Sequence, residues 1–183
     1  MTQVNHRLSR LILQDQDATS WDTSFLLSAA LWSKRSHDEQ TQCGCVLVKD
    51  KRTISTGYNG FISGIDDSVL PRCRPDKYPF MIHAEANAIY NAAKNGVSTV
   101  GSTCYVTAVP CLSCLQMLHQ CGISKIIFSD ISNPKMEIYS EKYEKVLGLL
   151  ADKMSIRYIR SDTLDTEMLE CILENFGKNE KPS

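Results

Sequence analysis

HAEANAIYNAAKN, residues 83–95, begins with a histidine and a glutamate two positions apart and continues in a pattern that predicts a helix ending near Gly96. Downstream, VPCLSC at residues 109–114 places Cys111 and Cys114 at the start of another predicted helix, with two residues between them. Either stretch alone is ordinary, because a His and a Glu can simply cap a helix and a close cysteine pair can be a redox pair or half of a structural metal site. Together they offer three metal ligands and one spare carboxylate.

These four side chains match what a catalytic zinc ion requires. Such an ion takes three protein ligands from His, Cys or carboxylate and leaves its fourth position open. Thiolates are favoured at a helix start, where the first N–H groups are unpaired, and His83 supplies the third ligand. Glu85 then lies close enough to the open position to carry protons without binding the metal. The alternative is a closed structural zinc with a fourth cysteine, either Cys73, Cys43 or Cys45, which leaves Glu85 without a role.

The elements on either side of these stretches predict an α/β fold. Residues 19–36 have the spacing of an amphipathic helix, with Trp21, Phe25, Ala29 and Trp32 on one stripe, and a strand, a charged turn and a second strand follow. A long irregular stretch then precedes His83, and after residue 95 strands and helices alternate. The predicted strands there are 103–108, 125–130 and 155–160, and the predicted helices are 111–121, 137–154 and 163–176. This order predicts a mixed five-stranded sheet covered by helices in three layers.

Composition sets limits on the class of protein. The chain has 183 residues, 43% of them apolar, and a net charge of −1, which fits a single domain over residues 1–183 with a core at about 21–160 and a C-terminal helix and short tail. The near-neutral charge argues against a nucleic-acid polymer as partner. Apolar runs are too short to span a membrane, and residues 1–16 lack the features of a secretory signal. We therefore expect a cytoplasmic protein with reduced cysteines.

The order H-x-E and then P-C-x-x-C is the signature of the zinc-dependent nucleobase deaminases, and the chain resembles the deoxycytidylate (dCMP) deaminase family from about Trp21 to Asp130. The resemblance extends beyond the zinc segments HAEANAI and VTAVPCLSC. It includes SWDTSFLLSAALWSKRS, CGCVLVKDKRTISTGYNGFISGIDD, VLPRCRPDKYP and CGISKIIFSD.

This resemblance implies a cytidine-deaminase-like fold, usually assembled as a homohexamer. It implies conversion of dCMP to dUMP, the precursor of thymidylate, and ammonia, with activation by dCTP and inhibition by dTTP, both with Mg²⁺. It assigns the catalytic Zn²⁺ to His83, Cys111 and Cys114, and the proton transfers to Glu85.

The resemblance and the chemistry of the substrate together nominate further residues. The substrate-binding candidates are Asn59, whose counterpart in the family holds the deoxyribose 3′-hydroxyl, together with Ala84, Val109 and Pro110. The candidates for the allosteric site are Gly57, Tyr58, Gly60 and Lys94. A phosphate needs compensating cations, and the candidates in the loop before His83 are Arg72, Arg74 and Lys77.

Some positions depart from the family pattern. Relatives commonly read VGAV where this chain reads CGCV, so Cys43 and Cys45 are either buried thiols or, with Cys73 and His37, part of a second metal site. Val109 stands where many relatives have an aromatic residue or serine, and SDISNP lacks a tyrosine that relatives place near the pyrimidine. These changes leave the chemistry intact but open the substrate to dCTP or a 5-substituted dCMP, and leave the regulation open too.

Two other classes of function compete with a dCMP deaminase. One is a deaminase of a related base, such as cytidine, dCTP or adenosine in RNA, and the net charge and lack of a basic stripe argue against RNA. The other is a non-catalytic zinc module that senses nucleotides or is purely structural. A purely structural site has no need of Glu85, which argues against this class.

Overall fold

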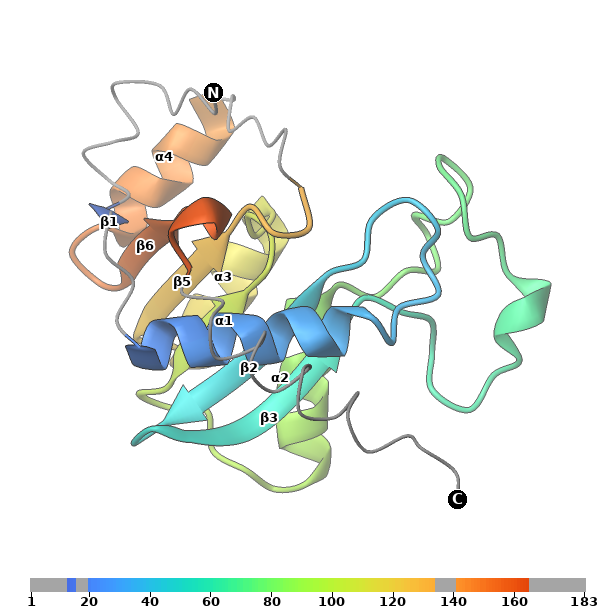
Figure 1. Cartoon of the computed structure of the whole chain (residues 1–183), viewed down its shortest axis with the longest axis horizontal. Helices are drawn as coiled ribbons and strands as arrows, with labels where there is room; N and C mark the ends of the chain where they lie inside the picture. The colour runs from blue at the N-terminus through green and yellow to red at the C-terminus, as the bar shows by residue number, and fades with distance from the viewer. Residues whose placement is uncertain (1–12, 16–19, 134–140, 165–183) are drawn as a thin grey trace, which may run out of the picture.

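The chain forms a sheet covered by helices on both faces (Figure 1), in a computed structural model that describes residues 13–15, 20–133 and 141–164. The strands are β1 (Leu13–Asp15), β2 (Gly44–Lys49), β3 (Arg52–Tyr58), β4 (Thr103–Val106), β5 (Lys125–Ser129) and β6 (Ser155–Ile159). The helices are α1 (Ser20–Ser33), α2 (Ala84–Lys94), α3 (Leu112–Gln120) and α4 (Glu141–Leu150), with short 3-10 turns η2 (Asp67–Val69) and η3 (Ser161–Thr163).

The sheet is mixed and has the order β1-β6-β5-β4-β2-β3. Strands β4, β5, β6 and β1 run parallel to one another, while β2 is antiparallel to both of its neighbours, β3 and β4. The predicted fold class is confirmed, but the sheet has six strands and not five. The extra strand, Leu13–Asp15, adds only three residues to the edge, which is too short for an alternating pattern to be recognised in the sequence.

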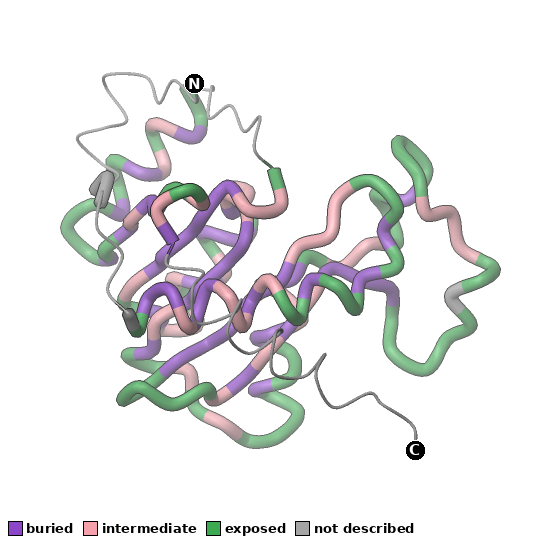
Figure 2. The backbone as a smooth tube through the Cα atoms, viewed as in Figure 1, coloured by how far each residue is buried: buried purple, intermediate pink, exposed green. Residues whose placement is uncertain are grey.

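Alternation along the strands separates two apolar cores. On β2, Cys45 and Leu47 point toward the core under α2, α3 and α4, whereas Val46 and Val48 point toward α1. Figure 1 shows α1 crossing one face of the sheet with α2 behind it, and Figure 2 shows the central strands buried between these layers. The predicted three-layer arrangement is therefore present.

Helix α1 turns a different face to the sheet than its spacing predicts. Phe25 and Ala29 are buried as expected, but Trp21 and Trp32 are exposed, and Asp22 lies in the interior. Apolar residues occur all around this helix, so its sequence does not distinguish the buried face from the outer one.

Turn residues end the elements close to the predicted positions. Asp50 and Lys51 both have positive φ, 52° and 59°, and form the two-residue turn between β2 and β3. Gly96 and Gly122, with φ of 65° and 78°, end α2 and α3. These helices accordingly match the ranges read from the sequence to within a few residues.

The long irregular stretch forms an excursion whose two ends are joined. Gly60 and Ile82 exchange backbone hydrogen bonds of 3.0 and 2.8 Å, so residues 60–82 leave and re-enter the domain at one point. In Figure 1 this segment extends away from the sheet. The bridge leads directly into His83 and thus fixes the start of α2.

The structure describes no residue after Leu164. The helix predicted at 163–176 therefore falls mostly outside the described residues, apart from η3. None of the helices within the described ranges is long and apolar enough to cross a bilayer.

Candidate active site

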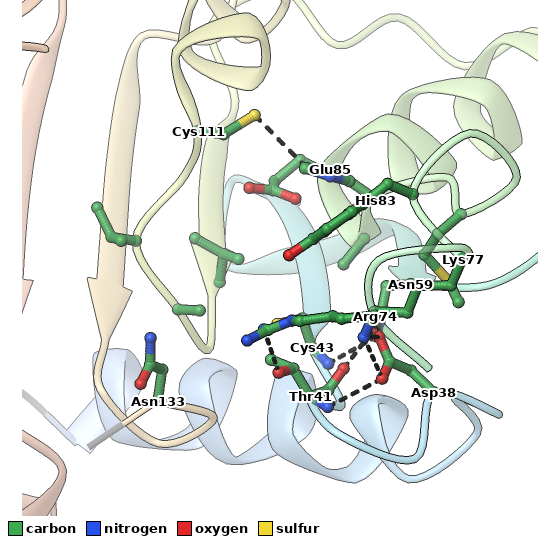
Figure 3. Close-up of a pocket in the computed structure, with 16 residues that line it drawn as sticks. Asp38, Thr41, Cys43, Asn59, Arg74, Lys77, His83, Glu85, Cys111 and Asn133 are labelled. Carbon is green, nitrogen blue, oxygen red and sulfur yellow. Dashed lines mark hydrogen bonds and ion pairs between the residues drawn. The ribbon is translucent and has the colours of Figure 1, made fainter. Parts of the chain in front are cut away.

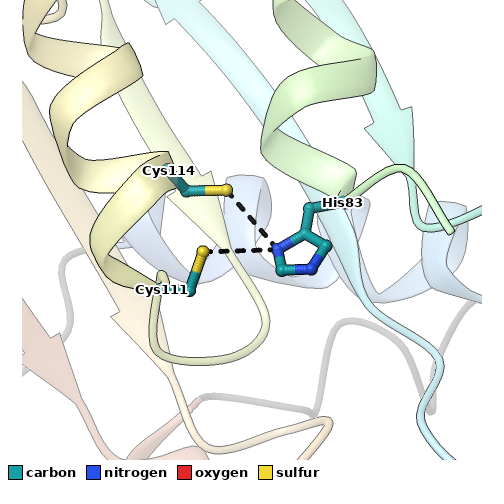
Figure 4. Close-up of side chains that lie close together, drawn as sticks. All are labelled: His83, Cys111 and Cys114. Atoms are coloured by element: carbon teal, nitrogen blue, oxygen red, sulfur yellow. Dashed lines mark hydrogen bonds between the residues drawn. The ribbon is translucent and has the colours of Figure 1, made fainter. Parts of the chain in front are cut away.

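The starts of α2 and α3 bring three metal-ligating side chains together. His83 Nδ1 lies 3.5 Å from Cys111 Sγ and 3.5 Å from Cys114 Sγ. Figure 4 shows the imidazole nitrogen facing both sulfurs. His83 and Cys111 are the N-cap residues of their helices, and neither side chain makes a capping hydrogen bond, which leaves both directed at the shared centre.

This donor set fits a tetrahedral zinc ion. Zinc bonds of about 2.3 Å to sulfur and 2.0–2.1 Å to nitrogen, at tetrahedral angles, separate the nitrogen and sulfur donors by about 3.6 Å. The observed separations of 3.5 Å agree. Within the described ranges, this is the single group of three or more such residues whose ligand atoms come close enough to hold one ion.

The protonation states favour a metal as well. The interactions of its sulfur with Cys114 and His83 lower the pKa of the Cys111 thiol and outweigh the opposing effect of burial. The interaction with Cys111, together with burial, raises the pKa of Cys114. The hydrogen bond to Cys111 raises the pKa of His83. The lowered pKa of Cys111 favours its thiolate, the form in which cysteine binds metals.

Glu85 lies beside this group without belonging to it. Its side chain is 5% exposed and lines the same pocket as His83 and Cys111. Figure 3 shows its carboxylate pointing into that pocket. Burial raises the pKa of this carboxyl, so it takes up a proton more readily than a carboxyl in water. The residue is placed to exchange protons with a molecule bound next to the metal ligands.

The pocket has a volume of about 230 Å³ and collects segments that are far apart in the chain. It is lined by Asp38, Thr41, Cys43, Asn59, Arg74, Lys77, Tyr78, Met81, His83, Ala84, Glu85, Val106, Ala108, Val109, Cys111 and Asn133. Of the predicted substrate-binding residues, Asn59, Ala84 and Val109 are in this lining. Pro110 is not: it is buried, and its carbonyl accepts a hydrogen bond from the Tyr143 hydroxyl at 2.8 Å.

Asn59 is held firmly in the pocket wall. Its Nδ2 donates to Asp38 Oδ2 at 3.1 Å and to the Thr41 carbonyl at 2.8 Å, and its Oδ1 accepts from the Cys43 N–H at 2.7 Å. Both amide hydrogens are thus engaged. The remaining lone pair of Oδ1 is the capacity left for a bound molecule, and it suits a hydroxyl donor.

The three predicted phosphate-binding cations have different surroundings. Lys77 is buried and bonded to both carboxylate oxygens of Asp38 at 2.6 Å, so its charge is already compensated. Arg74 is exposed at the pocket, where its Nη2 donates to Thr41 Oγ1 at 2.9 Å (Figure 3). In the described part of the chain Arg74 has no carboxylate partner. Arg72 is outside the pocket lining, and its charge interacts with that of Asp66.

Sequence reasoning missed Asp38, Asn133 and Tyr143. Asp38 follows α1 in the sequence, and only folding brings it next to the other pocket residues, so no spacing in the sequence indicates it. Asn133 lies beyond the carboxyl end of β5, the edge of a parallel sheet where ligands commonly bind, and that placement was the available signal. The spacing of Tyr143, Leu147 and Leu150 on α4 predicts burial but not the bond to Pro110.

A second pocket of about 280 Å³ lies against the outer side of α2. It is lined by His37, Tyr58, Gly60, Phe61, Ile62, Ser63, Gly64, Ile65, Asn87 and Asn91. Two predicted allosteric residues, Tyr58 and Gly60, belong to it, but Gly57 and Lys94 do not. A Cβ on Gly57 would come 2.3 Å from the Ala84 carbonyl oxygen, so this glycine permits close packing of β3 on α2. Lys94 is exposed at the end of α2.

The proposed second metal site does not assemble. Cys43 lines the first pocket, and Cys45 is fully buried with its Sγ 3.5 Å from that of Cys104. Cys73 is exposed and donates to Glu39, while His37 lies at the second pocket. The interpretation of Cys43 and Cys45 as buried thiols is confirmed for Cys45, whereas Cys43 is only partly buried because it lies in the wall of the first pocket.

Fold and site together define a class: a three-layer α/β protein with a three-ligand metal centre beside a buried carboxylate. Residues 19–130 match the cytidine and deoxycytidylate deaminase zinc-binding region, and the chain belongs to this family.

The chain is similar to several curated proteins of known name. It is 37% identical over 119 residues to human deoxycytidylate deaminase, covering 61% of this chain and 66% of that protein. It is 37% identical over 120 residues to the probable deoxycytidylate deaminase of Drosophila melanogaster, covering 59% of this chain and 58% of that one. The matched segments thus span less than two thirds of these relatives. ComE operon protein 2 of Bacillus subtilis is 30% identical over 161 residues, which cover 87% of this chain and 84% of that protein.

Solved structures agree with the fold. The dCMP deaminase of cyanophage S-TIM5 in apo form superposes with a TM-score of 0.62 at 26% identity, covering 77% of this chain and 98% of the phage protein. The same enzyme in complex with dCMP and dUMP gives a TM-score of 0.60 at 27% identity, covering 74% of this chain and 93% of the phage protein.

Proposed function

We propose that this chain hydrolytically deaminates dCMP, giving dUMP and ammonia. The observation that carries the proposal is the convergence of three metal ligands next to the buried Glu85 carboxylate in one pocket. The similarity to human deoxycytidylate deaminase, and to a phage enzyme crystallised with dCMP and dUMP, supports this substrate.

The residues divide the work between them. Zinc bound by His83, Cys111 and Cys114 supplies a Lewis acid that makes a water molecule strongly nucleophilic near neutral pH. Glu85 accepts the proton that water loses, delivers it to N3 of cytosine, and passes a second proton to the amino group leaving C4. The water oxygen becomes the new carbonyl oxygen, so the reaction consumes one water and no other reactant.

A substrate panel tests this function directly. Purified protein is incubated with dCMP, dCTP, deoxycytidine and CMP, and deamination is followed by absorbance. We expect preferential turnover of dCMP. The Glu85→Gln variant should keep its zinc and its fold and lose about 10²–10⁴-fold in turnover, because proton transfer by a positioned carboxylate contributes that much. Near-normal turnover by this variant would reject the assigned role.

The same panel separates the alternatives. Turnover of dCTP or of a 5-substituted dCMP at a comparable rate indicates a shifted substrate. Val109, which replaces the aromatic residue or serine of many relatives, lies in the pocket lining and is the residue that opens this alternative. No turnover of any compound by zinc-loaded protein indicates a non-catalytic module.

Arg74 is the proposed anchor for the 5′-phosphate, since its charge faces the pocket and that of Lys77 is compensated by Asp38. We expect Arg74→Gln to raise the KM for dCMP at least about tenfold, the loss of one charge-assisted hydrogen bond, and to leave deoxycytidine turnover unchanged. Arg72→Gln is the matched control from the same loop but outside the pocket lining. Equal effects of the two variants on the KM for dCMP would contradict the assignment.

Regulation by dCTP and dTTP with Mg²⁺ belongs to the proposal, at the pocket that contains Tyr58 and Gly60. Asn87 in that pocket donates to the Tyr58 carbonyl at 2.8 Å, and the Gly60–Ile82 bridge leads to His83, so a ligand there could bias the active site. Repeating the dCMP assay with each triphosphate plus Mg²⁺ tests this part, and sedimentation of the protein tests the homohexamer.

A further inference from the structure

The wall of the active-site pocket contains a buried ion pair that has no part in binding zinc. Lys77 Nζ lies 2.6 Å from both Oδ1 and Oδ2 of Asp38, and each side chain is 3% exposed. The residues are 39 positions apart: Asp38 follows α1, and Lys77 belongs to the excursion 60–82. The pair therefore ties the excursion to the pocket wall.

Stability alone does not explain such a pair. Removing two charges from water is costly, and apolar residues of similar volume often give an equal or more stable protein. What a carboxylate offers, and an apolar side chain does not, is several acceptor sites of defined direction.

The carboxylate of Asp38 accepts hydrogen bonds from groups that form the wall of the pocket. Oδ1 accepts from the backbone N–H groups of Gln40 at 2.9 Å and Thr41 at 3.0 Å, while Oδ2 accepts from Asn59 Nδ2 at 3.1 Å. Together with the Thr41 carbonyl and the Cys43 N–H, these bonds allow the Asn59 amide one orientation. Figure 3 shows Asp38, Asn59 and Lys77 grouped on this side of the pocket.

We infer that the Asp38–Lys77 pair is a positioning device for substrate selection: it supplies the third of the three bonds that hold the Asn59 amide with its oxygen as the available acceptor, and so sharpens the preference of the pocket for a sugar carrying a 3′-hydroxyl donor. The inference rests on the proposed function. Because Lys77 is neutralised within the pair, it also leaves Arg74 to hold the phosphate, so hydroxyl and phosphate are recognised by separate groups. Loss of the Lys77 charge frees Asp38 to protonate or turn away. The Asn59 amide then keeps its bonds to the Thr41 carbonyl and the Cys43 N–H but loses the third one, so the position of its Oδ1 is held less firmly.

The test compares dCMP with 2′,3′-dideoxycytidine 5′-monophosphate, which lacks the hydroxyl. For the wild type we expect kcat/KM to favour dCMP by about tenfold or more, the value of one hydrogen bond to a committed acceptor. In Lys77→Met this preference should fall severalfold, mainly through a higher KM for dCMP, because one of the three bonds that position the Asn59 amide is lost. The double variant Asp38→Asn with Lys77→Met leaves no unpaired charge at these two positions, so it is expected to fold even if the single variant does not, and it should show the same loss.

Asp22→Asn is the matched control, since Asp22 and Arg157 form another largely buried ion pair, 3.3 Å long, in the core on the α1 side. It should keep the 3′-hydroxyl preference whatever it does to stability. A wild type that does not turn over dCMP would reject the proposed function itself. A wild type that turns over both nucleotides equally, or Lys77 variants that keep the preference, would overturn the positioning role and leave the deaminase function standing.

Discussion

Asp38 is a carboxylate whose ionisation the surrounding structure requires. Burial acts to raise its pKa, but the hydrogen bond from Lys77 and those from the Gln40 and Thr41 N–H groups outweigh burial, so the pKa lies below its ordinary value. A depressed pKa contributes stability that is complete above the unfolded-state pKa, about 3.9, and is lost as the pH falls through the folded-state pKa.

We therefore expect the stability difference between wild type and Asp38→Asn to depend on pH in a defined direction. The wild type should be the more stable at pH 7, and its advantage should shrink as the pH falls below about 4. Urea unfolding of both proteins at several pH values measures this difference. Loss of zinc in acid affects both proteins alike and cancels. An advantage that grows toward low pH would contradict the direction of the shift.

Site residues that lie close together in the sequence can be grouped from their spacing. Residues that contact a partner far away in the sequence cannot. His83 and Glu85, and likewise Cys111 and Cys114, are spaced so that one helix start presents both members of each pair. The sequence makes Lys77 a phosphate candidate, because a cation in a polar loop carries no sign of which group it pairs with. Asp38 is 39 positions away, and only the folded chain joins them.

At the level of elements, β3 and α2 approach so closely that only glycine fits between them. A Cβ at Gly57 would lie 2.3 Å from the Ala84 carbonyl oxygen and 2.4 Å from the Ala88 nitrogen, both of them backbone atoms. This contact sets the height of α2 above the sheet. Since α2 begins with His83 and carries Glu85, it also sets the depth of the active site.

Gly57→Ala should therefore destabilise the protein by about 1–3 kcal/mol, because relieving the overlap forces α2 outward. Gly148→Ala is the paired control: this glycine lies inside α4 with no atom within 4 Å of an added Cβ, and alanine there should stabilise by about 0.5–1 kcal/mol. Chemical unfolding measures both changes. A neutral Gly57→Ala would show that β3 and α2 are free to separate.

The sequence predicts helices with strong periodicity and a glycine after their last residue. It does not predict the edge strand of the sheet or which face of α1 is buried. Gly96 and Gly122 mark the ends of α2 and α3 through their positive φ. The edge strand β1 contains a single apolar residue, Leu13, in three positions, so nothing in its composition distinguishes it from coil. Apolar residues surround α1, and its buried face depends on which side the sheet offers.

For the whole molecule, the metal centre joins parts of the fold that the chain places far apart. His83 follows the excursion and begins α2, while Cys111 and Cys114 follow β4 and begin α3, so an ion held by all three links two of the helices that cover one face of the sheet. The pocket beside it also draws on residues 38–43 and Asn133. Zinc should consequently stabilise the domain as well as serve the reaction.

A ligand that binds only the folded state stabilises it by RT ln(1 + [L]/Kd), about 2.7 kcal/mol at a hundredfold excess over Kd, and each kcal/mol raises the Tm of a domain of this size by roughly 2–4 °C. Removing zinc with a chelator should therefore lower the Tm of the wild type by at least about 5 °C. Cys114→Ser, which lacks one ligand, should contain less zinc and respond little to the chelator, whereas Glu85→Gln should respond as the wild type does. Differential scanning calorimetry with metal analysis of each sample measures these effects. A wild type that loses its zinc with no change in Tm would mean that packing between α2 and α3 already holds the two helix starts together, and that the ion serves the chemistry alone.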